Sequence, residues 1–265
     1  MSDLPLNRFK RALAAGRTQI GLWTTLGTGT SAEILGGAGF DWLLIDTEHS
    51  PTELPMVLEQ LRALEGGTAA PVVRPAWNDA VLIKRLLDLG VLTLLVPFVQ
   101  SAEEARRAVA ATRYPPAGIR GIAAVHRANR YGRVKDYHRR ADAEMCVLVQ
   151  IETRAALAEL EAIAAVDGVD GLFIGPSDLA GALGFLGDNR HPEAVAIFAE
   201  ACARAGRVGK PIGILAPVEE DARRYLEMGF TYVAVGNDAA VLRSAAEHLR
   251  ARFAGTGLGG KAVGG

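Results

Sequence analysis

The chain alternates short runs of β-forming residues with helical segments from one end to the other. Eight such runs occur, at residues 20–23, 42–46, 71–75, 93–97, 146–152, 171–175, 212–216 and 232–236. The segments between them carry apolar residues at helical spacing, as Ala80, Ile83 and Leu87 do. Eight nearly continuous apolar strands, each followed by a helix, indicate strands buried on both faces and predict an α/β fold, the (β/α)8 or TIM barrel. A doubly wound open sheet is the alternative.

Length and composition allow one large core. The chain has 265 residues, of which 49% are hydrophobic, so we expect a single barrel domain over residues 1–254 with a short helix near its start. The glycine-rich residues 255–265 can bury little surface and are expected to be disordered. Residues 114–144, between the helical segment 101–111 and the strand 146–152, are too long for an ordinary connection and predict an active-site loop.

Charge and hydropathy exclude several kinds of partner. The 29 Lys and Arg residues nearly balance the 30 Asp and Glu residues, and no basic run is interleaved with aromatic residues, so no nucleic acid partner is expected. No apolar stretch reaches the ~20 residues of a membrane span, and no signal peptide is evident, so no membrane contact and a cytoplasmic location are predicted. Cys146 and Cys202 lie in apolar segments and are expected to be buried thiols.

Polar residues gather where the predicted strands end, which is where barrels of this class carry their catalytic groups. The first strand ends at Trp23, the second leads to Asp46 and His49, the third carries Arg74, the fifth carries Gln150 and Glu152, and the sixth leads into Ser177 and Asp178. Trp23 and Leu215, at the ends of the first and seventh strands, are expected to line the substrate pocket. Side chains from several strands should therefore converge at one end of the barrel.

Two of the carboxylates, Glu152 and Asp178, belong to neighbouring strands, the fifth and the sixth. Side chains alternate along a strand, so Gln150 and Glu152 point the same way, and a buried Glu152 needs a cation, a basic partner or water. Pairing with Arg74 is one alternative, and helix capping is the alternative for Ser177 or Asp178. Together, Glu152 and Asp178 favour a hard divalent cation, Mg2+ or Mn2+ with Co2+ as a further option, which a 2-oxo acid could chelate.

Three further residues suit enolate chemistry at such a cation. Arg74 is a fixed positive charge that can stabilise an enolate oxygen, although a structural ion pair is the alternative. His49 is the histidine that directly follows a core strand, and Asp46 is a plausible orienting partner for it as a base. None of the five lysines lies at a strand's carboxyl end, so a Schiff-base aldolase is disfavoured. Serine-hydrolase, P-loop and dinucleotide-binding motifs are missing as well.

An ordered set of motifs resembles one known family. They are QIGLW (19–23), GFDWLLIDTEHSP (39–51), PVVRPAWND (71–79), TLLVPFVQSAEEAR (93–106), CVLVQIET (146–153), VDGVDGLFIGPSDLA (166–180) and YVAVGND (232–238). The chain resembles the HpcH/HpaI family of class II, metal-dependent pyruvate aldolases, which act on 4-hydroxy-2-oxoheptanedioate or 2-keto-3-deoxy sugar acids. The likeness extends over nearly the whole chain.

The resemblance implies a role for each candidate residue. It assigns the metal to Glu152 and Asp178, enolate stabilisation to Arg74, and base catalysis to His49 with Asp46 as its dyad partner. Pyruvate would contact Gln150 and the backbone around Ser177 and Asp178. Asp88 matches a supporting acidic position, and Arg127, in a loop one residue shorter than usual, matches an arginine that binds the acceptor carboxylate. The family also implies a homohexamer in which the last helix packs on a neighbouring subunit.

The expected reaction is reversible cleavage of a 4-hydroxy-2-oxo acid to pyruvate and an aldehyde through a pyruvate enolate. His49 would accept the C4 hydroxyl proton while the C3–C4 bond breaks. An acyl-CoA lyase of the malyl- or citryl-CoA type is a second hypothesis, and a barrel that only binds an oxo acid is a third. Glu48, between the two catalytic candidates, has no assigned role beyond a supporting hydrogen bond.

Overall fold

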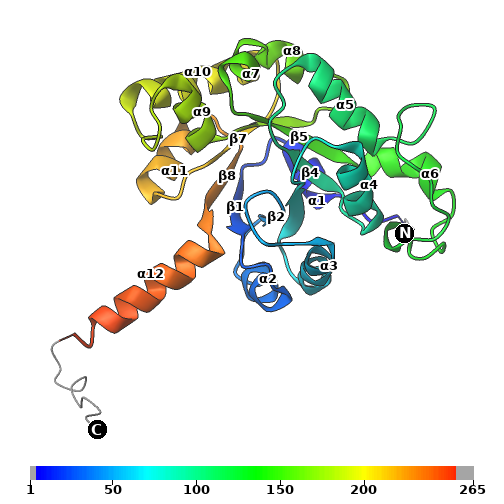
Figure 1. Cartoon of the computed structure of the whole chain (residues 1–265), viewed down its shortest axis with the longest axis horizontal. Coiled ribbons are helices and arrows are strands. Elements are labelled where there is room, and N and C mark those ends of the chain that lie inside the picture. The colour runs from blue at the N-terminus through cyan, green and yellow to red at the C-terminus, as the bar shows by residue number, and fades with distance from the viewer. Residues whose placement is uncertain (1–3, 255–265) are drawn as a thin grey trace, which may run out of the picture.

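The computed structural model describes residues 4–254, and in it eight parallel strands close into a barrel in chain order (Figure 1). The strands are β1 (Gln19–Thr24), β2 (Trp42–Asp46), β3 (Ala70–Arg74), β4 (Thr93–Val96), β5 (Cys146–Ile151), β6 (Gly171–Ile174), β7 (Ile212–Leu215) and β8 (Tyr232–Asn237). Because β8 pairs with β1, the sheet has no open edge. The TIM barrel prediction is confirmed, and the open-sheet alternative is wrong.

Helices connect the strands and surround the barrel. They are α1 (Arg8–Ala14), α2 (Gly29–Gly36), α3 (Leu54–Ala63), α4 (Ala80–Asp88), α5 (Ala102–Thr112), α6 (Tyr137–Arg140), α7 (Arg154–Ala158), α8 (Leu160–Ala164), α9 (Pro176–Leu183), α10 (Pro192–Arg207), α11 (Glu219–Glu227) and α12 (Asp238–Ala251). Short 3-10 turns occupy Leu64–Gly66, Arg127–Asn129 and Ala141–Glu144. Side-chain caps begin several helices: Asp79, for example, accepts hydrogen bonds from two backbone N–H groups of α4.

Alternation along the strands divides the apolar residues into two layers. Leu44 and Leu148 belong to a cluster inside the barrel. Their neighbours Ile45, Val147 and Val149 belong to a second cluster between the strands and the helices. Gln150 has the same parity as Leu148, so the predicted inward direction of this residue agrees with the packing. Polar residues of that parity at the carboxyl ends of the strands therefore face one another at the same end, which we call the rim.

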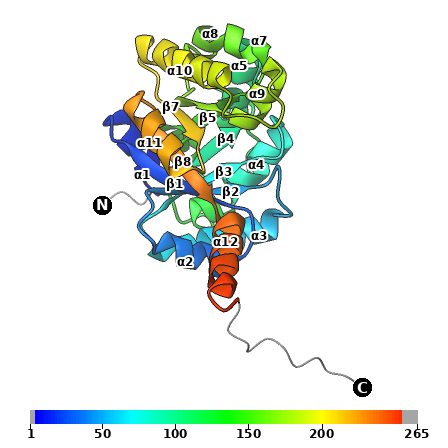
Figure 2. The same ribbon diagram turned by 90° about the vertical axis from the view of Figure 1, so that its left-hand side faces the viewer.

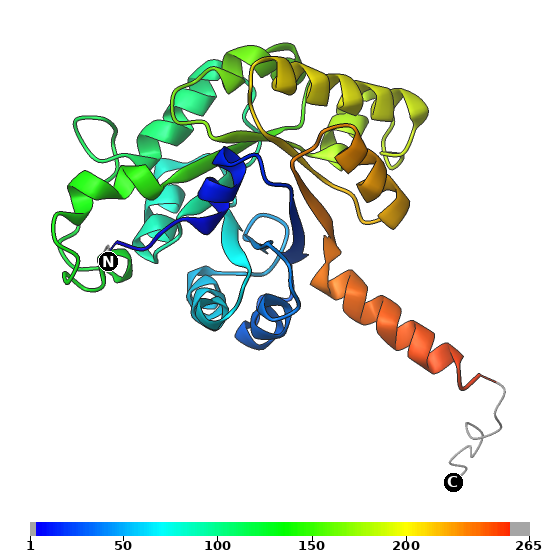
Figure 3. The ribbon, with the colours of Figure 1, turned by 180° about the vertical axis from the view of Figure 1, so that it is seen from behind.

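Helix α1 lies across the opposite, amino end of the barrel (Figure 3). The ring of Phe9 contacts Trp42 and Tyr232 edge-on, with ring centroids 5.8 and 5.6 Å apart. Phe9 is 1% exposed, so its ring packs with the barrel interior. This packing fills the amino end with apolar side chains and leaves the polar groups at the rim.

A glycine in β1 makes room for these aromatic rings. A Cβ at Gly21 would lie 2.6 Å from Nε1 of Trp42, so Gly21→Ala is expected to overpack the interior. We expect the free energy of unfolding to fall by roughly 1–3 kcal/mol in urea titrations. Gly206→Ala in α10, where no atom lies within 4 Å, is the control and should be neutral or stabilising. Equal stability of the two variants would contradict this account of the core.

Helix α12 projects away from the barrel (Figures 1 and 2). It is anchored at its first residue, Asp238, whose carboxylate accepts hydrogen bonds from the backbone of Thr25 at 2.8 Å and Leu26 at 3.1 Å. Farther along and just beyond the helix, apolar side chains are about half exposed, namely Val241, Leu242, Leu249 and Phe253. A helix with an uncovered apolar face is typical of an element that packs on another chain.

Two predictions concern matters beyond the barrel itself. Within residues 4–254, no helix is long and apolar enough to cross a membrane. The predicted tail, residues 255–265, lies outside the described residues.

Candidate active site

Asp46 and Arg74 form the centre of the rim. They end neighbouring strands, are partners in the register of β2 and β3, and have the inward parity, so their side chains meet. The guanidinium of Arg74 donates from Nε and Nη2 to the two Asp46 oxygens at 2.9 and 2.8 Å. Arg74 is 4% exposed and Asp46 1% exposed. This two-point ion pair fixes the plane of the guanidinium.

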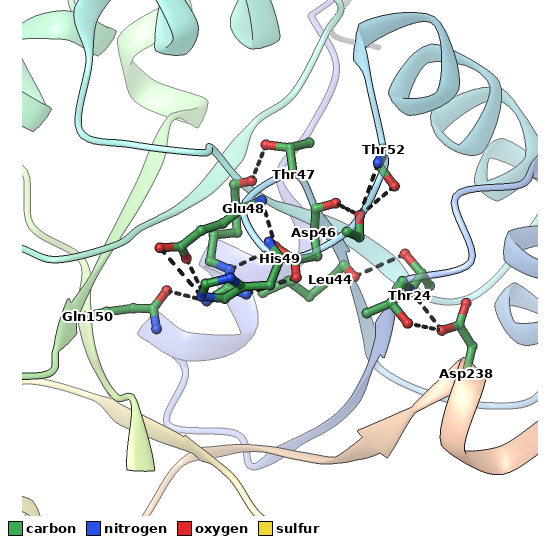
Figure 4. A network of polar contacts seen from close by, with 12 residues as sticks. Thr24, Leu44, Asp46, Thr47, Glu48, His49, Thr52, Gln150 and Asp238 are labelled. Carbon is green, nitrogen blue, oxygen red and sulfur yellow. Dashed lines mark hydrogen bonds and ion pairs between the residues drawn. The ribbon is translucent and has the colours of Figure 1, made fainter. Parts of the chain in front are cut away.

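Three more side chains hold the same guanidinium, and two of them, Glu48 and Gln150, are labelled in Figure 4. Nη1 of Arg74 lies 2.7 Å from Oε2 of Glu48 and 3.5 Å from Oε1 of Gln150. The indole of Trp23 packs on the guanidinium, with Cζ 4.3 Å from the ring centre. No role beyond a supporting hydrogen bond was predicted for Glu48, although its spacing of two residues from Asp46 is a signal that both carboxylates face Arg74.

His49 lies next to this pair on an exposed turn (Figure 4). Its side chain is 68% exposed, and Nε2 is 3.9 Å from Oε1 of Glu48. Oδ1 of Asp46 accepts hydrogen bonds from the backbone N–H groups of Glu48 at 3.0 Å and His49 at 3.5 Å. Asp46 thus holds the turn that carries His49, whereas its carboxylate is occupied by Arg74 rather than by the imidazole ring. The ring faces Glu48 instead.

Glu152 follows β5 and is held as a buried carboxylate. Its Oε1 accepts a hydrogen bond from Nε2 of Gln150, and its Oε2 accepts one from the backbone N–H of Phe98, both at 2.8 Å. Behind it, a Cβ at Gly175 would lie 2.6 Å from Cγ of Glu152, so only glycine leaves room for the carboxylate. Within the described part of the chain, Glu152 makes no ion pair, because Arg74 binds Asp46 and Glu48. The predicted alternative of a Glu152–Arg74 pair is wrong.

The environment of Glu152 disfavours its negative charge. Burial raises the pKa of its carboxyl to about 7, and the nearby charges of Asp178 and Glu48 add to the increase. Burial likewise raises the pKa of Glu48. Glu48 pairs with Arg74, whereas Glu152 has no basic partner among the described residues. A buried carboxylate of the latter kind suits a divalent cation, which would compensate its charge.

Asp178 lies in the first turn of α9, one strand along from Glu152, and both Ser177 and Asp178 are exposed there. Its charge acts on both Glu152 and Glu48, which places the three carboxylates in one electrostatic neighbourhood. No group of three or more His, Cys, Asp or Glu side chains with metal-binding geometry occurs within residues 4–254. Two carboxylates, Glu152 and Asp178, are the residues that could hold a cation here, and they would leave coordination positions for substrate and water, as oxygen-liganded Mg2+ sites in enzymes commonly do.

Apolar residues enclose the inner side of this group. Trp23 lies 6.3 Å from Phe173, measured between ring centroids, and Leu215 packs against the same interior cluster. Both residues predicted to line a substrate pocket thus lie at the carboxyl ends of their strands, and Trp23 lies beside Arg74. They form the apolar side of a site whose other side is charged.

Arg127 and Asp88 lie away from the rim in the folded chain. The loop 114–144 enters β5, so it lies at the amino ends of the strands, away from the rim. Arg127 binds Glu65 and donates to the carbonyl of Leu89 at 2.7 Å. It lines a cavity of about 680 Å3 that also includes Leu92, just before β4. Asp88 pairs with the buried Arg120 at 2.9 Å. Within one chain, the predicted active-site loop does not meet the other candidates.

Comparison with known proteins places this geometry in a family. The HpcH/HpaI aldolase/citrate lyase family matches residues 19–245. The chain is 56% identical over 248 residues to the 4-hydroxy-2-oxo-heptane-1,7-dioate aldolase of Shigella sonnei, an alignment covering 93% of this chain and 95% of that one. It is 54% identical over 252 residues to the 5-keto-4-deoxy-D-glucarate aldolase of Citrobacter koseri, covering 95% and 98%.

A solved structure agrees with these sequence matches. The crystal structure of an HpcH/HpaI aldolase/citrate lyase family protein from Burkholderia cenocepacia superposes with a TM-score of 0.89 at 39% identity, covering 94% of this chain and all of that one. The resemblance read from the sequence motifs is therefore confirmed. The chain belongs to the HpcH/HpaI aldolase/citrate lyase family and is a carbon–carbon lyase.

Proposed function

We propose that this protein is a metal-dependent aldolase that reversibly cleaves a 4-hydroxy-2-oxo acid to pyruvate and an aldehyde. The observation that carries the proposal is the buried Glu152 carboxylate, which lies near Asp178 and Arg74 and has no basic partner among the described residues. The two aldolases to which the chain is similar support it. In either named substrate, the carboxyl group next to the oxo group defines the α carbon, and cleavage between the β and γ carbons counted from it yields pyruvate.

Glu152 and Asp178 are the residues that would hold a divalent cation, with Mg2+ or Mn2+ favoured by the oxygen ligands and Co2+ as a further option. When bound, the cation supplies Lewis-acid polarisation of the 2-oxo group. Gln150 contacts the pyruvate portion of the substrate, and backbone N–H groups at Ser177 and Asp178, in the first turn of α9, bind its carboxylate.

The remaining residues move a proton and stabilise charge. In the cleavage direction, His49 accepts the proton of the C4 hydroxyl, the C3–C4 electron pair passes to the oxo acid, and the aldehyde leaves. Arg74 stabilises the negative charge on the enolate oxygen, and Asp46, Glu48 and Trp23 keep its guanidinium in place. Protonation of the enolate at C3 then completes pyruvate, and His49 gives up the proton that it accepted, so that no net proton is taken up.

We propose that the aldehyde product carries a carboxylate. The two substrates named for the relatives are dicarboxylic acids, so each aldehyde fragment retains a carboxylate. Trp23 and Leu215 would flank that fragment. Arg127 lies far from the rim of its own chain, so it could bind the acceptor carboxylate only in the site of another copy.

The uncovered apolar face of α12 favours a homo-oligomer, for which we propose a hexamer. We also propose a cytoplasmic location.

An aldehyde panel tests the reaction, the metal and the substrate together. Protein freed of metal by a chelator is incubated with pyruvate and each of succinic semialdehyde, tartronate semialdehyde and neutral aldehydes, with and without added Mg2+, Mn2+ or Co2+. Chromatography should detect a 4-hydroxy-2-oxo acid only in the samples with metal. Adduct formation at full rate under chelation, or none with any metal, would refute the proposal. Cleavage of malyl-CoA instead would favour the acyl-CoA lyase.

Replacing His49 separates proton transfer from metal binding. We expect His49→Asn to lower kcat for cleavage by about 10²- to 10⁴-fold, because a positioned base contributes on that scale. Mn2+ affinity, measured by calorimetry, should stay within twofold of wild type, since the His49 side chain is exposed and its ring faces Glu48 rather than Glu152 or Asp178. The control is His191→Asn at the start of α10, which should leave kcat unchanged. Loss of Mn2+ binding in His49→Asn would show that His49 is a ligand instead.

A further inference from the structure

Phe98 has an unusual backbone conformation at the position where it holds Glu152. It follows β4 and has φ +55°, in the left-handed region. A bulky aromatic residue adopts this region only where its surroundings impose it. In this conformation the backbone N–H donates to Oε2 of Glu152 at 2.8 Å. The strain is thus located at the hydrogen bond that aims one of the two proposed metal ligands.

The other restraints on Glu152 belong to rigid parts of the barrel. Gln150, which binds Oε1, is part of β5, and Gly175, which bounds the carboxylate from behind, follows β6. The bond from Phe98 comes from a loop instead. The direction of Oε2 therefore depends on what keeps this loop in its strained conformation.

Trp77 is placed to do this. It belongs to the loop between β3 and α4, and its ring stacks on that of Phe98 with centroids 5.6 Å apart and planes at 29°. Trp77 is 51% exposed, so the core does not require it. Asn78, next to Trp77, gives a second link, because its side chain donates to the carbonyl of Glu104 in α5, the helix that follows the Phe98 loop, at 3.1 Å. This second link should keep the loops together when the stack is removed.

We propose that Trp77 is a positioning residue for the metal site, which acts by stacking on Phe98 and so directing the Phe98 N–H at Glu152. This inference rests on the proposed function, because it takes Glu152 as a ligand of a divalent cation. A hydrogen bond donated to a metal-binding carboxylate by a group that does not itself touch the metal orients the ligand oxygen and strengthens its bond to the metal.

The test is a double-mutant cycle read by Mn2+ affinity. Chelator-treated wild type, Trp77→Ala, Phe98→Gly and the double variant are titrated with Mn2+ by calorimetry, and thermal melts check that each is folded. We expect Trp77→Ala to weaken Mn2+ binding by about tenfold. In the Phe98→Gly background the same change should have no effect, since glycine adopts positive φ freely and has no ring to stack. Trp77→Phe retains a ring and should bind Mn2+ nearly as wild type does.

Val81→Ala is the matched control, as Val81 is a neighbouring apolar residue with 54% exposure. It should not change Mn2+ affinity. Wild-type affinity in Trp77→Ala would overturn the inference and leave the proposed function intact, as would a tenfold loss that persists in the Phe98→Gly background. Failure of the wild-type protein to bind Mn2+ at all would refute the metal site itself and hence the proposed function.

Discussion

Glu152→Gln is expected to abolish metal-dependent cleavage while leaving the barrel as stable as wild type. Glutamine has the shape of glutamate and can still accept the hydrogen bond from the N–H of Phe98, but it removes the charge that would bind a cation. The loss of metal affinity should exceed the roughly 100-fold that removal of an outer hydrogen bond can cause. Stability should be maintained because the substitution also removes a buried charge without a basic partner among the described residues.

Two measurements check this expectation. Calorimetric titration with Mn2+ and a pyruvate-release assay report the loss of function, and urea unfolding of metal-free protein reports stability. Glu161→Gln is the control, since Glu161 pairs with Arg204 at the surface, far from the rim, and should leave metal binding unchanged. Metal-stimulated turnover in Glu152→Gln would mean that the cation binds elsewhere.

Arg74→Lys is expected to lower kcat by about 10²- to 10³-fold, the range for loss of one donor to a developing oxyanion. Lysine keeps the positive charge but cannot donate to both Asp46 oxygens and reach Glu48 at the same time. The larger change, Arg74→Ala, would leave Asp46 buried without its partner. We expect it to lower the free energy of unfolding by roughly 3–5 kcal/mol.

The same substitution at the surface provides the control. Arg113 pairs with Asp167, which is 90% exposed, so Arg113→Lys should change stability by less than about 1 kcal/mol and should not affect kcat. Steady-state kinetics and urea titrations of the three variants complete the comparison. If Arg74→Lys retained wild-type kcat, enolate stabilisation by a fixed guanidinium would be the wrong mechanism for this site.

The rim shows how far strand patterns predict a site. Alternation predicted that Gln150 and Glu152 face the same way, and the two side chains do bond to each other. It also placed Asp46 and Arg74 at the ends of adjacent strands, yet the partner assigned to Asp46 was His49. The choice between these partners depends on the register of β2 and β3, which sets Asp46 directly opposite Arg74. Register involves contacts between strands, and no pattern within one strand reveals it.

Other features of the site depend on contacts between distant segments. The bond from Phe98 to Glu152 joins positions 54 residues apart, and Phe98 has a positive φ that no sequence signal indicated. Arg127 was assigned by resemblance to a substrate-binding position, but in the folded chain it binds Glu65 at the opposite end of the barrel. The order of the elements explains this. Arg127 belongs to the loop 114–144, which leads into β5, and a loop that leads into a strand must lie at that strand's amino end.

The sequence by itself determined the barrel and the residue types at its rim, because apolar periodicity is local and each strand can be recognised from its own few residues. It also determined the family, through motifs spread over most of the chain. Only the tertiary structure decided which partner each charged group takes: Asp46 and Glu48 bind Arg74, while Glu152 has no basic partner among the described residues. The physical reason is that a charge interacts with whatever lies within a few ångströms, and closure of the barrel brings together residues that are distant in the chain.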